Sequence, residues 1–365
     1  MRKSGYFFFV AEPLGLSYTQ SRKKALRQAC AFLWQAQAQD GAWHSQTHGL
    51  LKQGVALSPF ILYTLLQVSP AVYAPNPQQM EKALQFILSQ TPNLEASQAL
   101  VLEYPNYTAA YTLLTLKKVN AQKYAAHIAR LSNYLRAQQF IEHRQINARR
   151  PGYGGWGFGE TKLPPGELGH VDLSHTRRIL EALQATQANM QEAWLQKARQ
   201  FLAACQSQQK EPGQQGSFYY SPVVLGANKA GQNTNGHILG YATATADGLL
   251  ASLAAGLSVS SPSVQKAWAW LRRYEQWHFP GGISPQDPAQ WHRTLVLYHI
   301  AVRAEAYQKM KHPAKQWRER MWQALQPYQQ ANGSFANPEG SRNKENDPLV
   351  GTALAIIALN AAQHE

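Results

Sequence analysis

The sequence predicts an all-α protein, an (α/α)6 toroid with an inner and an outer ring of helices. Three observations support this prediction: a two-helix unit occurs six times, half-polar helices alternate with helices that are apolar on nearly every face, and glycine-rich turns join them. A repeat of this kind determines the architecture of a chain. Helices that are apolar all round must be buried, whereas helices with one charged face lie at the surface. Six of each therefore predict two concentric rings.

The first helix of each unit carries a pair of apolar residues. The six pairs are Phe32-Leu33, Phe86-Ile87, Tyr134-Leu135, Phe201-Leu202, Trp270-Leu271 and Ala324-Leu325. In the first copy, Arg22, Lys23 and Arg27 lie beside the apolar positions Ala25 and Cys30, as in a helix with one charged and one buried face. These helices are expected in the outer ring.

A glycine-containing turn follows five of the six first helices. The turns are Gly41-Ala42-Trp43, Gly154-Gly155-Trp156, Gly216-Ser217-Phe218, Gly281-Gly282 and Gly333-Ser334-Phe335. The second copy has only Thr91-Pro92-Asn93 in this place. A second, more apolar helix follows each turn. The predicted ranges of these inner helices are 58–68, 107–118, 172–183, 243–255, 289–304 and 347–361.

The repeat predicts a single domain, because six helical hairpins account for nearly all of the 365 residues. We expect one toroid over residues 21–365, preceded by an N-terminal segment over residues 1–20. This segment begins somewhat like a signal peptide, but its apolar stretch is too short and no small-residue cleavage site follows. It is expected to pack on the toroid, with an interfacial membrane anchor as the alternative. No apolar run is long enough to span a membrane.

The formal net charge of +14 favours anionic partners. The basic residues are spread along the chain without a nucleic-acid-binding motif, so nucleic acid is not expected as a partner. A solvated basic surface is the first interpretation, and peripheral contact with an anionic membrane is the second. Cys30 and Cys205 both lie in first helices and are expected in the core rather than in a disulfide. We predict a cytoplasmic location, with the inner membrane face as the place of any peripheral contact.

The first helix and its turn resemble the QW repeat of squalene–hopene cyclases and related triterpene cyclases, from about residue 24 to residue 361. The clearest copy is the aromatic-aliphatic run Ala31-Phe32-Leu33-Trp34 followed by Gln37 and by Asp40-Gly41-Ala42-Trp43. Protein prenyltransferase β-subunits share the toroid. The resemblance implies that the glutamine and the aromatic residue connect neighbouring helix ends. An amide oxygen accepting the free N–H groups of a helix N-terminus would achieve this.

A second stretch resembles the cyclase segment that carries the DxDDT acid motif after a Gly-Gly-Trp loop. Gly154-Gly155-Trp156-Gly157-Phe158 is followed by His170-Val171-Asp172-Leu173-Ser174-His175-Thr176. Aligning the threonines places Asp172 at the first aspartate, Ser174 at the middle one and His175 at the last. The middle aspartate is the acid in that family, and serine cannot replace it. The resemblance implies Asp172, His175 and Ser174 as the catalytic candidates, with helix capping as the alternative role of Asp172.

Further candidates lie where the inner helices begin, and these ends would surround the cavity. Thr176, Thr245, Thr294 and Thr352 are expected at similar depth in four inner helices. The candidate substrate-binding residues are Tyr107, Trp156, Phe158, Tyr241, Asp247, Trp291, His292 and Asp347. Aromatic faces stabilise cations, although packing and capping are the alternative roles. The histidines and cysteines have no metal-binding spacing, so no metal and no cofactor is expected.

Three functions remain open on this basis. The first is a toroid that binds a linear isoprenoid or another lipid and cyclises or isomerises it by acid–base chemistry. The second is a non-catalytic toroid that binds a lipid or a protein. The third is an (α/α)6 carbohydrate-active enzyme, which needs two carboxylates across a cleft. An aliphatic and aromatic cavity would favour a lipid, and paired carboxylates would favour a sugar.

Overall fold

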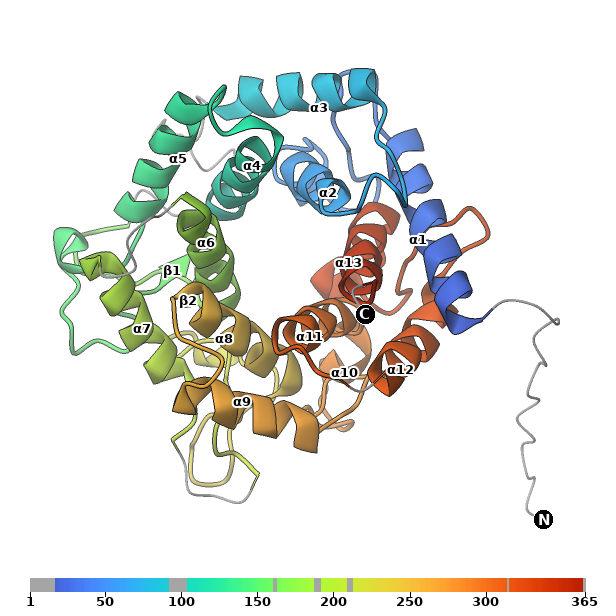
Figure 1. The fold of residues 1–365 in the computed structure, drawn as a ribbon. Coiled ribbons are helices and arrows are strands. Elements are labelled where there is room, and N and C mark those ends of the chain that lie inside the picture. The colour runs from blue at the N-terminus through green and yellow to red at the C-terminus, as the bar shows by residue number, and fades with distance from the viewer. Residues whose placement is uncertain are drawn as a thin grey trace, which may run out of the picture.

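The computed structural model describes residues 17–91, 104–159, 163–186, 192–208, 213–313 and 315–363. The helices form two concentric rings (Figure 1), so the prediction of an all-α toroid is confirmed. The inner ring comprises α2 (Leu57–Leu66), α4 (Pro105–Asn120), α6 (Leu173–Thr186), α8 (Ala242–Ala254), α11 (Leu297–Lys309) and α13 (Pro348–Ala361). The outer ring comprises α1 (Tyr18–Gln35), α3 (Pro77–Gln90), α5 (Ala125–Ala137), α7 (Ala193–Cys205), α9 (Pro262–Arg273) and α12 (Gln316–Leu325). The residues before position 17, where the membrane anchor was the alternative, lie outside the described residues.

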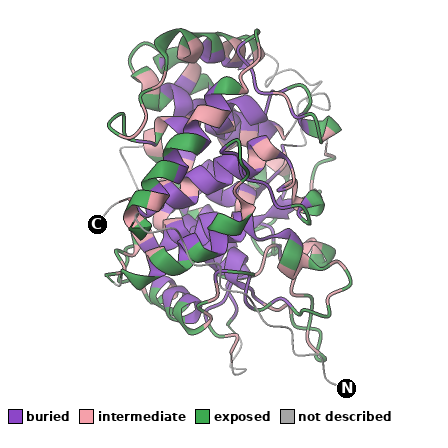
Figure 2. Cartoon of the chain, turned by 90° about the vertical axis from the view of Figure 1, so that its right-hand side faces the viewer, coloured by how far each residue is buried: buried purple, intermediate pink, exposed green. Residues whose placement is uncertain are grey.

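Each inner helix contacts the next one around the ring, and α13 also contacts α2. On the outside, α1 packs against both α12 and α13, which closes the ring between the two ends of the chain. Figure 2 shows buried residues concentrated in the interior and exposed residues on the outward helix faces. Cys30 and Cys205 are free and buried, as expected of core residues. Within the described residues, no helix is both long and apolar enough to cross a membrane.

The fifth inner helix differs from its predicted range of 289–304. A short helix, α10 (Trp291–Thr294), comes first, and α11 begins only at Leu297. The buried carboxylate of Glu345 explains this boundary, since it accepts the backbone N–H groups of Val296 at 3.0 Å, Leu297 at 2.8 Å and Tyr298 at 2.8 Å. These are N–H groups that the first turn of a helix leaves without intrahelical partners. The cap comes from the loop before α13, so local periodicity does not reveal it.

The glutamines of the repeat connect neighbouring outer helices. Gln37 Nε2 donates at 2.9 Å to the carbonyl of Gly41 in its own turn and at 2.9 Å to the carbonyl of Gln79 in the first turns of α3. Gln139 and Gln206 make the same pair of bonds in their repeats, reaching α7 and α9. The connection therefore exists, but the expected chemistry was wrong. The amide nitrogen donates, because the side chain lies between two carbonyl oxygens.

The turns of the repeat are built around close backbone approaches and buried rings. Gly41 has a φ of +90°, and a Cβ atom there would lie 2.3 Å from the carbonyl oxygen of Lys82, so the position requires glycine. The indole nitrogens of Trp43 and Trp156 donate to the carbonyls of Leu33 at 2.6 Å and Leu135 at 2.7 Å. Both rings are fully buried.

A hydroxyl group of the following inner helix holds each aromatic turn. The oxygen of Thr176 accepts the backbone N–H of Trp156 at 3.0 Å. Thr245 and Thr352 do the same for Phe218 and Phe335, at 3.0 and 2.9 Å. The fourth threonine, Thr294, has no hydrogen-bond partner for its hydroxyl among the described residues. It lies in α10, where the regular helix is interrupted.

One small antiparallel sheet precedes α6. Its strands are β1 (Trp156–Gly157) and β2 (Val171–Asp172), with Trp156 paired to Asp172. This pairing brings the Gly-Gly-Trp turn next to the start of α6. It therefore places Phe158, His170 and His175 in one cluster of rings, with centroids 4.3 Å apart between Phe158 and His170 and 4.7 Å apart between Phe158 and His175.

Candidate functional site

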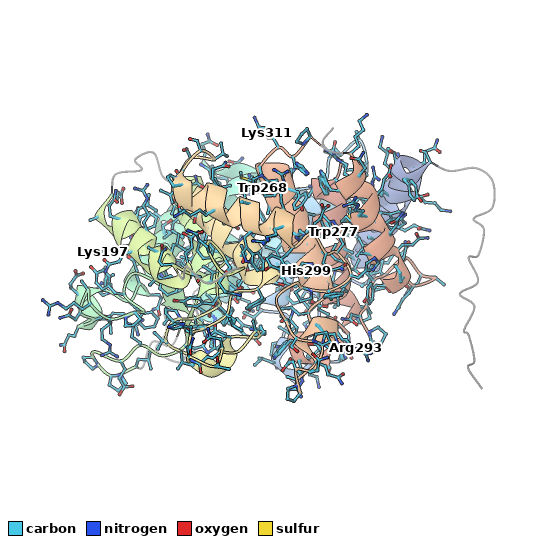
Figure 3. The ribbon with its side chains drawn as sticks, turned by 90° about the horizontal axis from the view of Figure 1, so that it is seen from below. Lys197, Trp268, Trp277, Arg293, His299 and Lys311 are labelled. Atoms are coloured by element: carbon cyan, nitrogen blue, oxygen red, sulfur yellow. The ribbon has the colours of Figure 1, made fainter. Side chains whose placement is uncertain are left out.

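A cavity of about 310 Å³ lies among the inner helices, and residues of all six inner helices or their leading loops line it. The lining positions recur every three or four residues, as Tyr298, Ala301, Val302 and Glu305 do on α11. This spacing shows one helix face turned toward the cavity. Figure 3 shows Arg293 and Lys311 at opposite faces of the toroid, with His299 between them, so α11 crosses the molecule from one face to the other. The cavity wall includes the first turns of the inner helices and continues along α11 to Glu305 and along α13 to Ile357.

Aromatic and aliphatic side chains make up most of the cavity wall. The aromatic ones are Phe60, Tyr104, Tyr107, Tyr111, Phe158, Tyr220, Tyr241 and Tyr298. The aliphatic ones include Leu57, Leu295, Val302, Val350, Leu354 and Ile357. A wall of this composition is suited to a ligand with an extended apolar part, and the ring faces offer negative potential to a cation.

Asp172 and His175 form a buried pair at the start of α6. One carboxylate oxygen of Asp172 accepts the backbone N–H of His175 at 2.9 Å, which is the capping bond predicted from the sequence. The other lies 2.7 Å from His175 Nδ1, so this ring nitrogen carries the proton. Burial alone would raise the pKa of Asp172, but the charge of His175 and its hydrogen bonds outweigh burial and hold that pKa below its ordinary value.

The imidazole of His175 is held between aromatic rings with its second nitrogen unpaired. Its ring centroid lies 4.1 Å from that of Tyr107 and 4.7 Å from that of Phe158. Nε2 has no hydrogen-bond partner among the described residues. Because Asp172 fixes the proton on Nδ1, Nε2 of the neutral ring is a lone-pair acceptor. His175 lines the cavity, whereas Asp172 does not.

Asp247 on α8 is one of the two carboxylates that line the cavity, and Glu305 is the other. It accepts hydrogen bonds from Arg177 Nη1 at 2.9 Å, from Ser174 Oγ at 3.0 Å and from the Tyr298 hydroxyl, which lies 3.0 Å from each carboxylate oxygen. Burial raises the pKa of Asp247 above its ordinary value, although Arg177 and the two hydroxyls oppose this shift. A raised pKa favours the protonated carboxylic acid at a given pH.

A buried charge cluster lies beside Asp247. Arg177 also contacts Glu181 at 2.8 Å and Glu305 at 2.6 Å, and Arg178 contacts Glu181 at 2.6 Å. Both arginines are buried, and charge interactions with these glutamates raise their pKa against the opposing effect of burial. Every charged group in this cluster therefore has a partner of opposite sign.

The structure brings about half of the predicted site residues to the cavity. Tyr107, Phe158, Ser174, His175, Tyr241 and Asp247 line it. Asp172, Trp156, Trp291, His292 and Asp347 are not part of its wall. Trp156 packs in its turn, and Asp347 caps α13 by accepting the N–H groups of Leu349 and Val350. The ring of Trp291 lies against the ammonium group of Lys229 at 5.1 Å.

Several cavity residues were not predicted from the sequence. Tyr298 and Glu305 lie on α11, whose start was predicted too early in the sequence, so the face that it turns to the cavity was not predicted. Lys229 and Lys344 lie in loops. One signal was available for the charge cluster: Arg177-Arg178 followed by Glu181 interrupts an otherwise apolar inner helix. Among the described residues, no group of three or more histidine, cysteine, aspartate or glutamate side chains is arranged to hold a metal ion.

No protein-family model matches the sequence, and no curated protein matches it either. Solved structures match its fold. The type II terpene cyclase MstE from Scytonema has a TM-score of 0.56 and 14% identity, covering 93% of this chain and 97% of that one. A variant of that cyclase in complex with its substrate geranylgeranyl dihydroxybenzoate has a TM-score of 0.58 and 14% identity, covering 94% and 98%.

A second class of enzyme shares the architecture. The GH76A α-1,6-mannanase from Salegentibacter sp. HEL1_6 has a TM-score of 0.56 and 10% identity, covering 95% of this chain and 99% of that one. The chain thus has the (α/α)6 toroid fold of type II terpene cyclases, and mannanases have it too. Identities this low show the fold alone, because one fold hosts many functions.

Proposed function

We propose that this protein is a terpene cyclase-like enzyme that binds a linear isoprenoid or a similar lipid in its cavity and isomerises or cyclises it by acid–base chemistry. The observation that carries the proposal is a single aromatic cavity that holds both Asp247, whose pKa burial raises, and His175, whose Nε2 is unpaired. Two titratable groups in different electrostatic environments are the usual basis of acid and base roles.

Asp247 is the proposed acid. In its protonated form it donates its proton to a carbon–carbon double bond, which leaves a carbocation and the Asp247 carboxylate. Arg177, Ser174 and Tyr298 then stabilise that carboxylate with the hydrogen bonds that the structure shows. The ring faces of the wall stabilise the positive charge on the substrate.

His175 is the proposed base. Its Nε2 takes a proton from a carbon next to the cationic centre, which forms a new double bond and an imidazolium ion. The carboxylate of Asp172, 2.7 Å from Nδ1, stabilises that ion and keeps the ring in the required tautomer. The product has the composition of the substrate, and the proton returns to Asp247 through solvent after product release. In this proposal Asp172, one of the catalytic candidates of the sequence analysis, is a positioning residue.

A carbohydrate-active enzyme is the second candidate, because the mannanase neighbours share the fold. An inactive variant of that mannanase has two consecutive aspartates replaced by alanine. This chain has no two consecutive acidic residues. The two cavity carboxylates, Asp247 and Glu305, bind the same guanidinium group, so they do not flank a free cleft. These observations favour the lipid.

The test is product analysis by mass spectrometry after incubation with farnesyl and geranylgeranyl substrates, and in parallel with α-1,6-linked mannan oligosaccharide. We expect an isomeric product from an isoprenoid, and a loss of about 100-fold or more in rate for Asp247→Asn. Glu339→Gln, which alters an exposed carboxylate, is the matched control, and circular dichroism checks that each variant folds.

Two results would overturn the proposal. Isoprenoids that bind and are recovered unchanged would indicate a non-catalytic binding toroid. Cleavage of the oligosaccharide without conversion of any isoprenoid would indicate the carbohydrate-active alternative.

A further inference from the structure

The charged residues that line the cavity fall into two groups. Those at its inner end are paired: Arg178 with Glu181, and both Asp247 and Glu305 with Arg177. The other two, Lys229 and Lys344, have no ion pair with a carboxylate within the described part of the chain. An unpaired cation at a cavity wall is costly to the fold unless a ligand neutralises it.

Lys229 lies in the loop that leads to α8 and is half-buried. Its ammonium group is 3.9 Å from the ring centroid of Tyr220 and 5.1 Å from that of Trp291, and it donates to the carbonyl of Ala227 at 3.1 Å. Burial lowers the pKa of this lysine to about 8, although the charges of Asp172 and Asp247 oppose the shift. Ring faces and one carbonyl hold the ammonium in place without neutralising it.

Lys344 also lines the cavity, from the loop that leads to α13. Its ammonium group lies 5.3 Å from the ring centroid of Tyr104, and its backbone φ is +62°. The adjacent Glu345 fixes this loop, because its carboxylate is bound to the first N–H groups of α11. A loop held in this way positions Lys344 on the face of the toroid where the inner helices begin.

We infer that Lys229 and Lys344 form a binding site for the anionic headgroup, phosphate or carboxylate, of a lipid whose apolar chain fills the aromatic part of the cavity. This inference rests on the proposed function and narrows its substrate class to amphiphiles with one charged end. The headgroup lies at the mouth and the chain points toward Asp247 and His175. Two ammonium groups and ring faces supply what such a headgroup needs: charge neutralisation and partial exclusion of water.

The test compares lipids with one geranylgeranyl chain and different ends: the alcohol, the carboxylic acid, the monophosphate and the diphosphate. Their dissociation constants are measured by calorimetry with the wild-type protein, Lys229→Gln, Lys344→Gln and the double variant. Lys266→Gln, an exposed lysine on α9, controls for the general effect of net charge. We expect the anionic lipids to bind about tenfold or more tightly than the alcohol, which corresponds to about 1.4 kcal/mol.

The double variant should abolish this preference and leave binding of the alcohol unchanged, and Lys229→Arg with Lys344→Arg should restore it. Equal binding of alcohol and anionic lipids to the wild type would overturn the inference while leaving the proposed function intact. Failure of every lipid to bind would instead overturn the proposed function. Inorganic phosphate that binds as tightly as the phosphorylated lipids would show a free-anion site and overturn the assignment to a lipid headgroup.

Discussion

Arg177 Nη1 lies 2.9 Å from a carboxylate oxygen of Asp247, and this contact joins the charge cluster of the toroid to its cavity. The same guanidinium group binds Glu181 and Glu305, so three carboxylates share one buried cation. Asp247 therefore depends on α6 and α11 for its electrostatic environment, although it lies on α8.

Removing this cation should strongly destabilise the fold. We expect Arg177→Met to lower the free energy of unfolding by about 3–5 kcal/mol, because it leaves the buried carboxylate of Asp247 and the half-buried one of Glu305 without an ion pair. Urea denaturation followed by circular dichroism measures the change. Arg293→Met is the control, since Arg293 pairs with Glu339 at an exposed site and should cost less than about 1 kcal/mol. Similar losses for the two variants would contradict this account.

Replacing Asp172 by asparagine should reduce activity much more than stability. In Asp172→Asn, the amide oxygen keeps the capping bond to His175 N–H, so the free energy of unfolding should fall by only about 1 kcal/mol at neutral pH. The amide group cannot stabilise an imidazolium ion, so turnover should fall by about 100-fold or more. The rate of isoprenoid conversion and urea denaturation measure the two effects. Comparable losses of folding and rate would mean that Asp172 acts only as a cap.

The Asp172–His175 pair has a defined pH dependence. The folded-state pKa of Asp172 is below its ordinary value, so its contribution to stability is present above about pH 4 and is lost as the pH falls further. The ordinary pKa of aspartate is about 4. The difference in unfolding free energy between the wild type and Asp172→Asn should therefore narrow as the pH falls from about 5 to about 2. A difference that stays constant over this range would contradict the assignment.

The tryptophans of the turns should contribute through their indole nitrogens. We expect Trp43→Phe to lower the unfolding free energy by about 1–3 kcal/mol, since it removes the indole hydrogen bond to the buried carbonyl of Leu33. We expect Trp156→Phe to cost about 1 kcal/mol, since the carbonyl of Leu135 loses the indole but still accepts the backbone N–H of Gln138 at 3.2 Å. Trp322→Phe is a matched control, because its indole nitrogen has no hydrogen-bond partner among the described residues. It should cost less than the other two. Lipid binding should be unchanged in all three.

The lowered pKa of Lys229 predicts that this residue costs stability at neutral pH. Its folded-state pKa of about 8 lies below its ordinary value of 10.5. The unfolded chain binds more protons between these values, so the wild type loses stability as the pH falls through this window. Lys229→Met should remove this loss and gain about 1–2 kcal/mol relative to the wild type on going from pH 10.5 to pH 7. Lys23→Met, on the exposed face of α1, should show no such change in thermal or urea unfolding.

The rings of the fold were predictable from the sequence because each helix carries its own burial pattern. The apolar faces of α2, α4 and α13 depend on residues within one repeat, and the turns are marked by their own glycines, although the carbonyl that requires Gly41 belongs to Lys82 in the next repeat. The cap of α11 was not predictable, because Glu345 reaches it from a loop 48 residues away from Leu297. The same reason applies to the cavity. Asp247 was predicted as a candidate because it lies near the start of an inner helix, but its partners Arg177 and Tyr298 come from two other helices.

The contact of α1 with α12 and α13 has a consequence for how the chain loses its structure. In an open array of helical hairpins the first and last units have one neighbour each, and such arrays unravel from their ends. Here every hairpin has two neighbours, so there is no weak terminal unit from which unravelling can start. Unfolding should therefore be a single cooperative event, and deleting any one hairpin would expose two apolar faces at once.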